Sequence, residues 1–151
     1  MNHVVGLLRP ATIAVDMDVS SKKRLFETIG DLFASQGLSA SLVFDSLLAR
    51  EKLGSTGLGQ GIAIPHGRIK GLKEAAGAFV RLRTPIAFDA PDNQPVNMVF
   101  VLLVPEQATD LHLHILGELA QLFSDPAMRT TLSALPDADA VLQALGNWHA
   151  S

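Results

Sequence analysis

Apolar residues recur along the chain in two periods, and these periods predict where helices and strands lie. Over residues 20–37 and 39–52 they recur every three to four positions, which is typical of helices that bury one face. Ser20 or Ser21 is the expected N-cap of the first helix, and Ser39 is the expected cap of the second. Further helices are predicted over residues 110–123, 126–135 and 136–145.

The middle of the chain has the shorter apolar runs that are typical of strands. Residues 96–104 are almost continuously apolar, which predicts a central strand covered on both faces. Residues 12–17 alternate weakly and predict an edge strand. Three more strands are expected, over residues 62–64, 75–83 and 86–90. Pro65 should end the first of them, and Thr84-Pro85 should separate the second from the third.

This order of elements predicts the fold class. Helices lead, strands fill the middle and helices close the chain, which favours an α/β sandwich with a mixed sheet and helices packed on both of its faces. A length of 151 residues fits a single domain over residues 1–151 with a core of its own.

Composition narrows the class of protein. The chain has no cysteine, which excludes disulfides, thiolate metal sites and cysteine nucleophiles and favours a cytoplasmic location. The net charge is −3 and no basic face is visible, so nucleic acid is not an expected partner. The longest apolar run, over residues 98–104, is too short to cross a bilayer, so no membrane insertion is expected.

The stretch from Gly54 to Gly67 contains five glycines, a proline and a histidine between two regular elements. Glycines allow tight turns and let backbone N–H groups point at a ligand. The stretch does not fit the known nucleotide loops: a Walker A loop needs Lys where Gln60 follows Gly59, and Ile62 stands where the dinucleotide fingerprint needs its third glycine. We therefore expect a strand end and turn that expose one histidine.

That histidine, His66, is the strongest candidate for chemistry. A neutral imidazole can attack phosphorus and form a labile P–N bond, provided that N–H groups or cations hold the phosphoryl oxygens. Backbone amides of the glycine stretch and Arg50 could do so. Three alternatives stay open. His66 could be an ordinary turn residue, Arg50 could pair with Glu51 or an acidic loop, and the hydroxyls of Ser55 and Thr56 could cap the turn instead of binding oxygens.

His112 and His114 form a pair that suggests a metal, but helical geometry argues against one. Residues two apart on a helix point to different faces, so one ion cannot bind both, and no metal site is expected. His112 shares a stripe with Leu116 and should face inward, whereas His114 shares one with Glu118 and should face water. His112 is then either a core histidine bonded to backbone or a group that faces an anion at the helix N-terminus.

Taken together, these motifs resemble a known family. They are REKLGSTG at 50–57, GIAIPHG at 61–67, IAFDAPDNQPV at 86–96, LLVP at 102–105 and His112-Leu113. In register over nearly the whole chain, they resemble the fructose/mannitol (type 2) IIA proteins of the bacterial phosphoenolpyruvate-dependent phosphotransferase system. Within that family, the runs at 50–57 and 86–96 look closest to the nitrogen-regulatory members.

The resemblance implies a mixed sheet of about five strands and a phosphotransfer role through a phosphohistidine, not free-standing turnover. It implies phosphorylation of His66 on Nε2 by an HPr-like carrier, with His112 stabilising the phosphoryl group and Arg50 contacting the group or the partner. Ser55, Thr56, Gly57 and Gly67 are the expected phosphate cradle, and no cofactor is expected.

The resemblance also implies regulation of partners in potassium transport, sensor-kinase or stress signalling. Two alternatives remain at this point. One is a sugar-specific IIA protein that passes its phosphoryl group to a IIB domain, and the other is a binding module in which His66 is never phosphorylated. The regulated target and the oligomeric state are not predicted.

Overall fold

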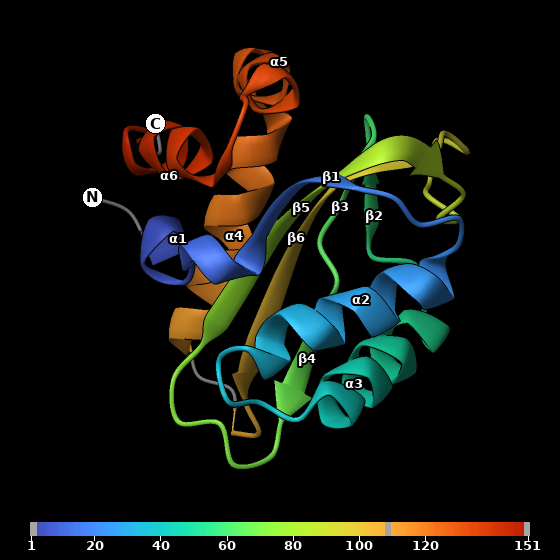
Figure 1. Ribbon diagram of the computed structural model, residues 1–151, viewed down its shortest axis with the longest axis vertical. Coiled ribbons are helices and arrows are strands. Elements are labelled where there is room, and N and C mark those ends of the chain that lie inside the picture. Colours follow the sequence, from blue (N-terminus) through green and yellow to red (C-terminus); the bar gives the residue numbers. More distant parts are fainter. Residues whose placement is uncertain (1–2, 108–109, 150–151) are drawn as a thin grey trace.

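A mixed β-sheet forms the middle layer of the protein in the computed structural model, which describes residues 3–107 and 110–149 (Figure 1). Its order is β1-β5-β6-β3-β2, and β4 also pairs with β6. The strands are β1 (Ile13–Met17), β2 (Gly57–Gly59), β3 (Ile62–Ala63), β4 (His66–Ile69), β5 (Ala76–Ile86) and β6 (Val96–Pro105).

Strand β6 lies at the centre of this sheet, as its apolar sequence predicts. On one edge it pairs antiparallel with β5, and on the other it pairs in parallel with β3 along Met98 and Val99 and with β4 from Leu102 to Pro105. Two short strands therefore share one side of β6, so six strands occupy five positions. The predicted sheet of about five strands is confirmed, and β1 is the edge strand that was expected.

Helices cover both faces of the sheet, which confirms the predicted α/β sandwich (Figure 1). Alternate residues of β6 enter two cores: Met98, Phe100 and Leu102 pack with α4 and its neighbours, while Val99 and Val101 pack with α2 and α3. The helices are α1 (His3–Gly6), α2 (Lys22–Ala34), α3 (Ala40–Lys52), α4 (Asp110–Ser124), α5 (Pro126–Ala134) and α6 (Ala138–Gly146), with a 3-10 turn η1 at Pro10–Thr12.

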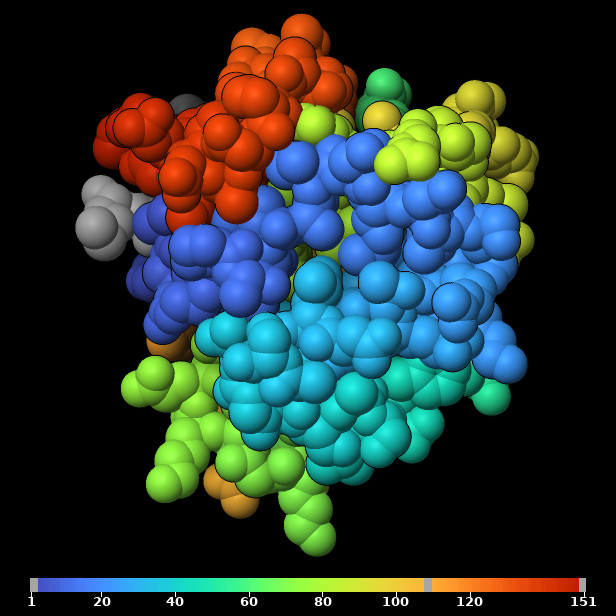
Figure 2. Space-filling model, viewed as in Figure 1, coloured from blue at the N-terminus to red at the C-terminus, as the bar shows by residue number. Residues whose placement is uncertain are grey.

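The long helices α2 and α3 begin where side-chain caps stand. The Ser21 hydroxyl accepts from the Arg24 N–H and the Ser39 hydroxyl from the Leu42 N–H, so the predicted serine caps are confirmed. The two helices lie side by side over one face of the sheet and form one broad surface of the molecule (Figure 2). None of the helices in the described ranges is long and apolar enough to cross a membrane.

The structure corrects several predicted strand boundaries. Residues 66–69, expected as a turn and loop, form strand β4, and the glycine stretch contributes the short strand β2. Strand β5 runs through Thr84 and Pro85 to Ile86, so the predicted interruption is wrong, and no strand continues over 87–90. Pairing with β6 explains β4 and the uninterrupted β5, and pairing with β3 explains β2, because a neighbouring strand supplies backbone partners that short or proline-containing segments do not specify by themselves.

Candidate active site

His66 begins strand β4 directly after Pro65 and is half-buried. Its Nδ1 lies 3.1 Å from the carbonyl oxygen of Ile64. A carbonyl oxygen can only accept, so Nδ1 must carry the proton in this contact. The neutral ring therefore keeps its lone pair on Nε2, the nitrogen that is available to a reacting group.

A break in the sheet creates this arrangement. Strand β3 ends at Ala63 and β4 starts at His66, so Ile64 and Pro65 lie between two strands that share the side of β6. The Ile64 N–H donates to the Thr56 carbonyl at 3.0 Å, and the Pro65 carbonyl accepts from the Leu102 N–H at 3.0 Å. The backbone that leads into His66 is thus fixed, while the Ile64 carbonyl is turned to the imidazole.

His66 opens onto a surface depression of about 240 Å³. Four segments form it: the end of α3, the glycine stretch, the segment before β4 and one face of α4. Its lining includes most of the predicted site residues but neither Gly67 nor His112; it consists of Arg50, Ser55, Thr56, Gly57, Leu58, Ile64, His66, Leu116 and Ala120.

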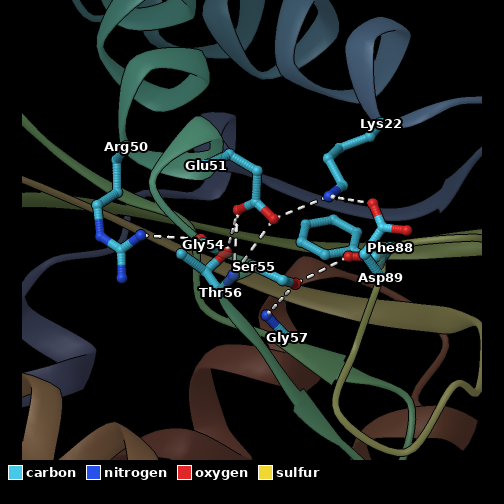
Figure 3. Close-up of polar contacts among 9 residues, drawn as sticks. All are labelled: Lys22, Arg50, Glu51, Gly54, Ser55, Thr56, Gly57, Phe88 and Asp89. Carbon is cyan, nitrogen blue, oxygen red and sulfur yellow. Dashed lines mark hydrogen bonds and ion pairs between the residues drawn. The ribbon is translucent and has the colours of Figure 1, made fainter.

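Arg50 supplies a cation at the edge of the depression. It lies in the last turn of α3, and its Nη1 donates to the Gly54 carbonyl at 2.9 Å (Figure 3). Within the described residues Arg50 makes no ion pair, so the alternative in which it pairs with Glu51 or an acidic loop is not what the structure has. A guanidinium carries five N–H donors, so donors beyond this one bond can face an anion.

The hydroxyls of the expected cradle already have partners inside the protein. Ser55 Oγ donates to the Phe88 carbonyl at 2.8 Å and accepts from the Gly57 N–H at 3.1 Å. Thr56 is buried, and its Oγ1 donates to Glu51 Oε1 at 2.6 Å. These bonds favour the capping alternative for both residues, and their role in holding phosphate stays a prediction.

From the sequence, Glu51 is expected only as an alternative partner of Arg50. In the structure it holds together the side of the depression that Thr56 forms. Its side chain is 4% exposed and accepts from Lys22 Nζ at 2.8 Å. The Thr56 N–H lies 3.2 Å from each Glu51 oxygen, and Lys22 also reaches Asp89 at 3.4 Å. We call Lys22, Glu51, Thr56 and Asp89 the Glu51 network (Figure 3).

Gly67 lies on the other side of the sheet from the depression. It is buried in β4, and a Cβ built on it would stand 2.3 Å from Ser46 Oγ of α3. The lack of a side chain therefore lets β4 pack against α3. This contact gives Gly67 a structural reason of its own, and its inclusion in the phosphate cradle stays a prediction.

The two histidines of α4 point as their periodicity predicts. His112 is 8% exposed, while His114 is exposed. His112 lies one turn before Leu116, which lines the depression, so it approaches the site from the N-terminal end of α4. Over residues 3–107 and 110–149, no group of three or more side chains could hold a metal ion.

The hairpin of β2 and β3 carries the glycine stretch. At its tip Gly59, Gln60 and Gly61 have φ of 90°, 58° and 80°. The Asp92 carboxylate accepts from the Gln60 N–H at 2.9 Å and from the Gln94 N–H at 3.1 Å. These two backbone bonds, with Gln60 the larger cause, hold the pKa of Asp92 below its usual value.

Comparison with known proteins identifies the family to which this site belongs. The family described as "Phosphoenolpyruvate-dependent sugar phosphotransferase system, EIIA 2" matches residues 6–148. The chain belongs to this family. The type 2 IIA resemblance inferred from the motifs is thereby confirmed.

Relatives of this IIA chain carry a regulatory name. The "Nitrogen regulatory protein" of Pseudomonas aeruginosa is 43% identical over 145 residues, which cover 95% of this chain and 94% of the relative. That of Klebsiella oxytoca is 53% identical over 116 residues, covering 76% of this chain and 72% of the relative. The predicted similarity to nitrogen-regulatory members is confirmed.

Solved structures support the same conclusion. The nitrogen regulatory protein IIA-Ntr from Neisseria meningitidis superposes with a TM-score of 0.90 at 51% identity, covering 95% of this chain and 99% of that one. The mannitol IIA of Escherichia coli superposes with a TM-score of 0.75 at 22% identity, covering 91% and 98% of the two chains. This second likeness shows a shared fold.

Proposed function

We propose that this IIA chain is a phosphoryl-carrier regulator that accepts a phosphoryl group on Nε2 of His66. The observation that carries the proposal is the contact between His66 Nδ1 and the Ile64 carbonyl, because it leaves the lone pair on the outward nitrogen. The proposed donor is a phosphohistidine of an HPr-like carrier protein, as the family resemblance implies.

The transfer exchanges one P–N bond for another. The Nε2 lone pair of His66 attacks phosphorus, the bond from phosphorus to the carrier's histidine breaks, and its electron pair returns to that histidine. Positive charge develops on the His66 ring as the new bond forms. The Ile64 carbonyl, which accepts a hydrogen bond from Nδ1–H, stabilises that charge.

Arg50 and His112 are the groups proposed to hold the phosphoryl oxygens. Arg50 lines the depression with His66 and donates one N–H to Gly54, so its other donors can contact the dianion. His112 lies in the first turn of α4, whose N-terminal backbone dipole favours negative charge. Ser55 and Thr56 are proposed to shape the wall, since both hydroxyls have partners.

Regulation is proposed over sugar transfer because of the relatives' names. Proteins called nitrogen regulatory protein match this chain at 43% and 53% identity, whereas the mannitol IIA likeness rests on 22%. We propose that a charge of about −2 on His66 changes which partners can dock at the depression. The proposed partners act in potassium transport, sensor-kinase or stress signalling.

The first test is phosphorylation followed by intact mass. With phosphoenolpyruvate, enzyme I and an HPr-like carrier, the wild-type chain should gain one acid-labile phosphoryl group. His66→Ala should gain none and keep its fold, because a half-buried residue at a surface depression contributes little packing. Labelling retained in a folded His66→Ala variant, or no adduct on wild type with any cognate donor, would overturn the proposal.

The histidines of α4 form a matched pair in the same experiment. His112→Ala should slow transfer or shorten the lifetime of the phosphorylated form, because it removes a group near the helix N-terminus. His114→Ala should change neither, since that side chain is exposed on another face. Equal effects of the two substitutions would contradict the role given to His112.

A further inference from the structure

We infer that Glu51 is a positioning residue for His66. In this inference, which rests on the proposed phosphotransfer function, the buried carboxylate fixes Thr56, Thr56 fixes Ile64, and the Ile64 carbonyl fixes the proton of His66 on Nδ1. The Glu51 carboxylate contacts Lys22 and Thr56, and the bonds from Thr56 to Ile64 and from Ile64 to His66 link it to the imidazole.

The first step is the set of donors around the carboxylate. Glu51 Oε1 accepts from Thr56 Oγ1 at 2.6 Å, Oε2 accepts from Lys22 Nζ at 2.8 Å, and the Thr56 N–H lies 3.2 Å from both. Hydrogen bonds to an ionised acceptor are stronger and more directional than those between neutral groups. The backbone and the side chain of Thr56 are thus both held by one buried anion.

The second step leads from Thr56 to the imidazole. The Thr56 carbonyl accepts from the Ile64 N–H at 3.0 Å, so the two ends of the β2–β3 hairpin are joined beside the site. The carbonyl of the same Ile64 residue lies 3.1 Å from His66 Nδ1. A shift of Thr56 therefore moves Ile64, the residue whose carbonyl selects the tautomer of His66.

The third step explains what holds the carboxylate itself. Lys22, in the first turn of α2, brings its ammonium group to Glu51, to Asp89 at 3.4 Å and over the Phe88 ring at 4.5 Å from its centre (Figure 3). Three separate segments, the start of α2, the end of α3 and residues 88–89, therefore meet at one cation. The wall of the depression is fixed from outside the glycine stretch.

Stability alone is a weak explanation for this arrangement. A buried ion pair contributes little net stability relative to an apolar pair, because desolvation offsets most of the attraction between the charges. Directional bonds do fix geometry, and here they end on the residue that precedes Pro65 and His66. The effect that we assign to these contacts is therefore to position the Ile64 carbonyl beside His66.

The test uses Glu51→Gln. Glutamine keeps the size of the side chain, but its amide nitrogen, a donor, replaces one of the two acceptor oxygens, and the neutral amide no longer forms an ion pair with Lys22. We expect a larger fraction of the Nε2–H tautomer of His66 and a phosphorylation rate about five- to tenfold lower, the change that loosening one hydrogen bond produces. Nitrogen-15 NMR of the His66 ring, at a pH where it is neutral, measures the tautomer in the unphosphorylated protein.

Matched variants separate positioning from general loosening. Glu27→Gln breaks the exposed pair with Arg24 in α2 and should leave tautomer and rate as in wild type. Lys22→Met should reproduce the Glu51→Gln effect, and Lys22→Arg, which keeps the cation, should restore it. If Glu51→Gln does not fold, Lys22→Met carries the test with the same two outcomes.

The two readouts distinguish this inference from the proposed function. A wild-type chain that no donor phosphorylates overturns the function, while the NMR comparison still decides the positioning role. A folded Glu51→Gln or Lys22→Met variant with the tautomer population of Glu27→Gln overturns the positioning role, whatever its phosphorylation rate.

Discussion

At the scale of single residues, Gly67 shows how closely β4 approaches α3. An added Cβ would stand 2.3 Å from Ser46 Oγ and 3.1 Å from Ser46 Cβ. We expect Gly67→Ala to lower the free energy of unfolding by about 1–3 kcal/mol, the usual cost of overpacking a buried contact. Urea denaturation measures the change.

A second glycine is the control for this prediction. Gly117 lies inside α4, and no atom stands within 4 Å of a Cβ built there. Gly117→Ala should raise the free energy of unfolding by up to about 1 kcal/mol, because alanine is the better helix former. Gly67→Ala with wild-type stability would mean that Ser46 moves aside at no cost.

Residue roles were predictable where they follow from local pattern. The inward face of His112 and the outward face of His114 follow from helical periodicity, and both are confirmed. The partner of Glu51 was not predictable, because Lys22 is 29 residues away and only the packing of α2 on α3 brings them together. The Arg50 contact with Gly54 is local, but a guanidinium near a chain turn has several equivalent acceptors.

At the scale of elements, the β2–β3 hairpin depends on one carboxylate outside it. Asp92 accepts from the N–H of Gln60, which has a φ of 58°, and from the N–H of Gln94. These two bonds lower the pKa of Asp92. A carboxyl whose pKa is lower in the folded state stabilises the protein above its ordinary pKa of about 3.9. This stabilisation is lost as the pH falls through the lowered value.

Asp92→Asn should therefore destabilise the protein near neutral pH, and the difference from wild type should shrink as the solution is acidified below about pH 4. Thermal unfolding of both proteins across this range measures it. A difference that stays constant from about pH 7 to about pH 3 would show that the charge of Asp92 does not hold the hairpin.

Helices and strands could be predicted where residues close in the sequence specify them, and not where pairing with a distant segment does. Helices α2 and α3 lie where periodicity and the caps Ser21 and Ser39 place them, because capping involves residues only three apart. Strands β2 and β4 were missed, since each is short and contains glycine. What makes β4 a strand is its pairing with Leu102 to Pro105, more than thirty residues away in the sequence.

At the scale of the whole molecule, Arg81 joins the sheet to the helices of one face. From β5 its Nε donates to the Val15 carbonyl at 2.9 Å, and Nη1 donates to the carbonyls of Leu132 and Leu135 at 2.9 and 2.7 Å. The guanidinium thus ties the edge strand β1 to the end of α5. The order of elements in the sequence predicts the fold class, but it does not predict this link between distant segments.

Arg81→Met should lower the free energy of unfolding by about 2–4 kcal/mol, because three carbonyls lose a charged donor while the apolar stem is kept. Phosphorylation of His66 in the folded variant should be unchanged. Arg83→Met, two residues on, loses exposed ion pairs with Asp16 and Asp18 and should change stability little. Similar losses in the two variants would contradict the link.

The break between β3 and β4 has a consequence for how the site tolerates sequence change. The acceptor for His66 Nδ1 is the main-chain oxygen of residue 64, and every amino acid has that oxygen. Exchanging the Ile64 side chain leaves the acceptor atom in place, whereas an acceptor on a side chain would be lost when that residue is substituted. A mutation displaces this oxygen only if it shifts the backbone segments that hold it. The amino acids tolerated at position 64 are therefore limited by how their side chains pack and not by the need for a hydrogen-bond acceptor.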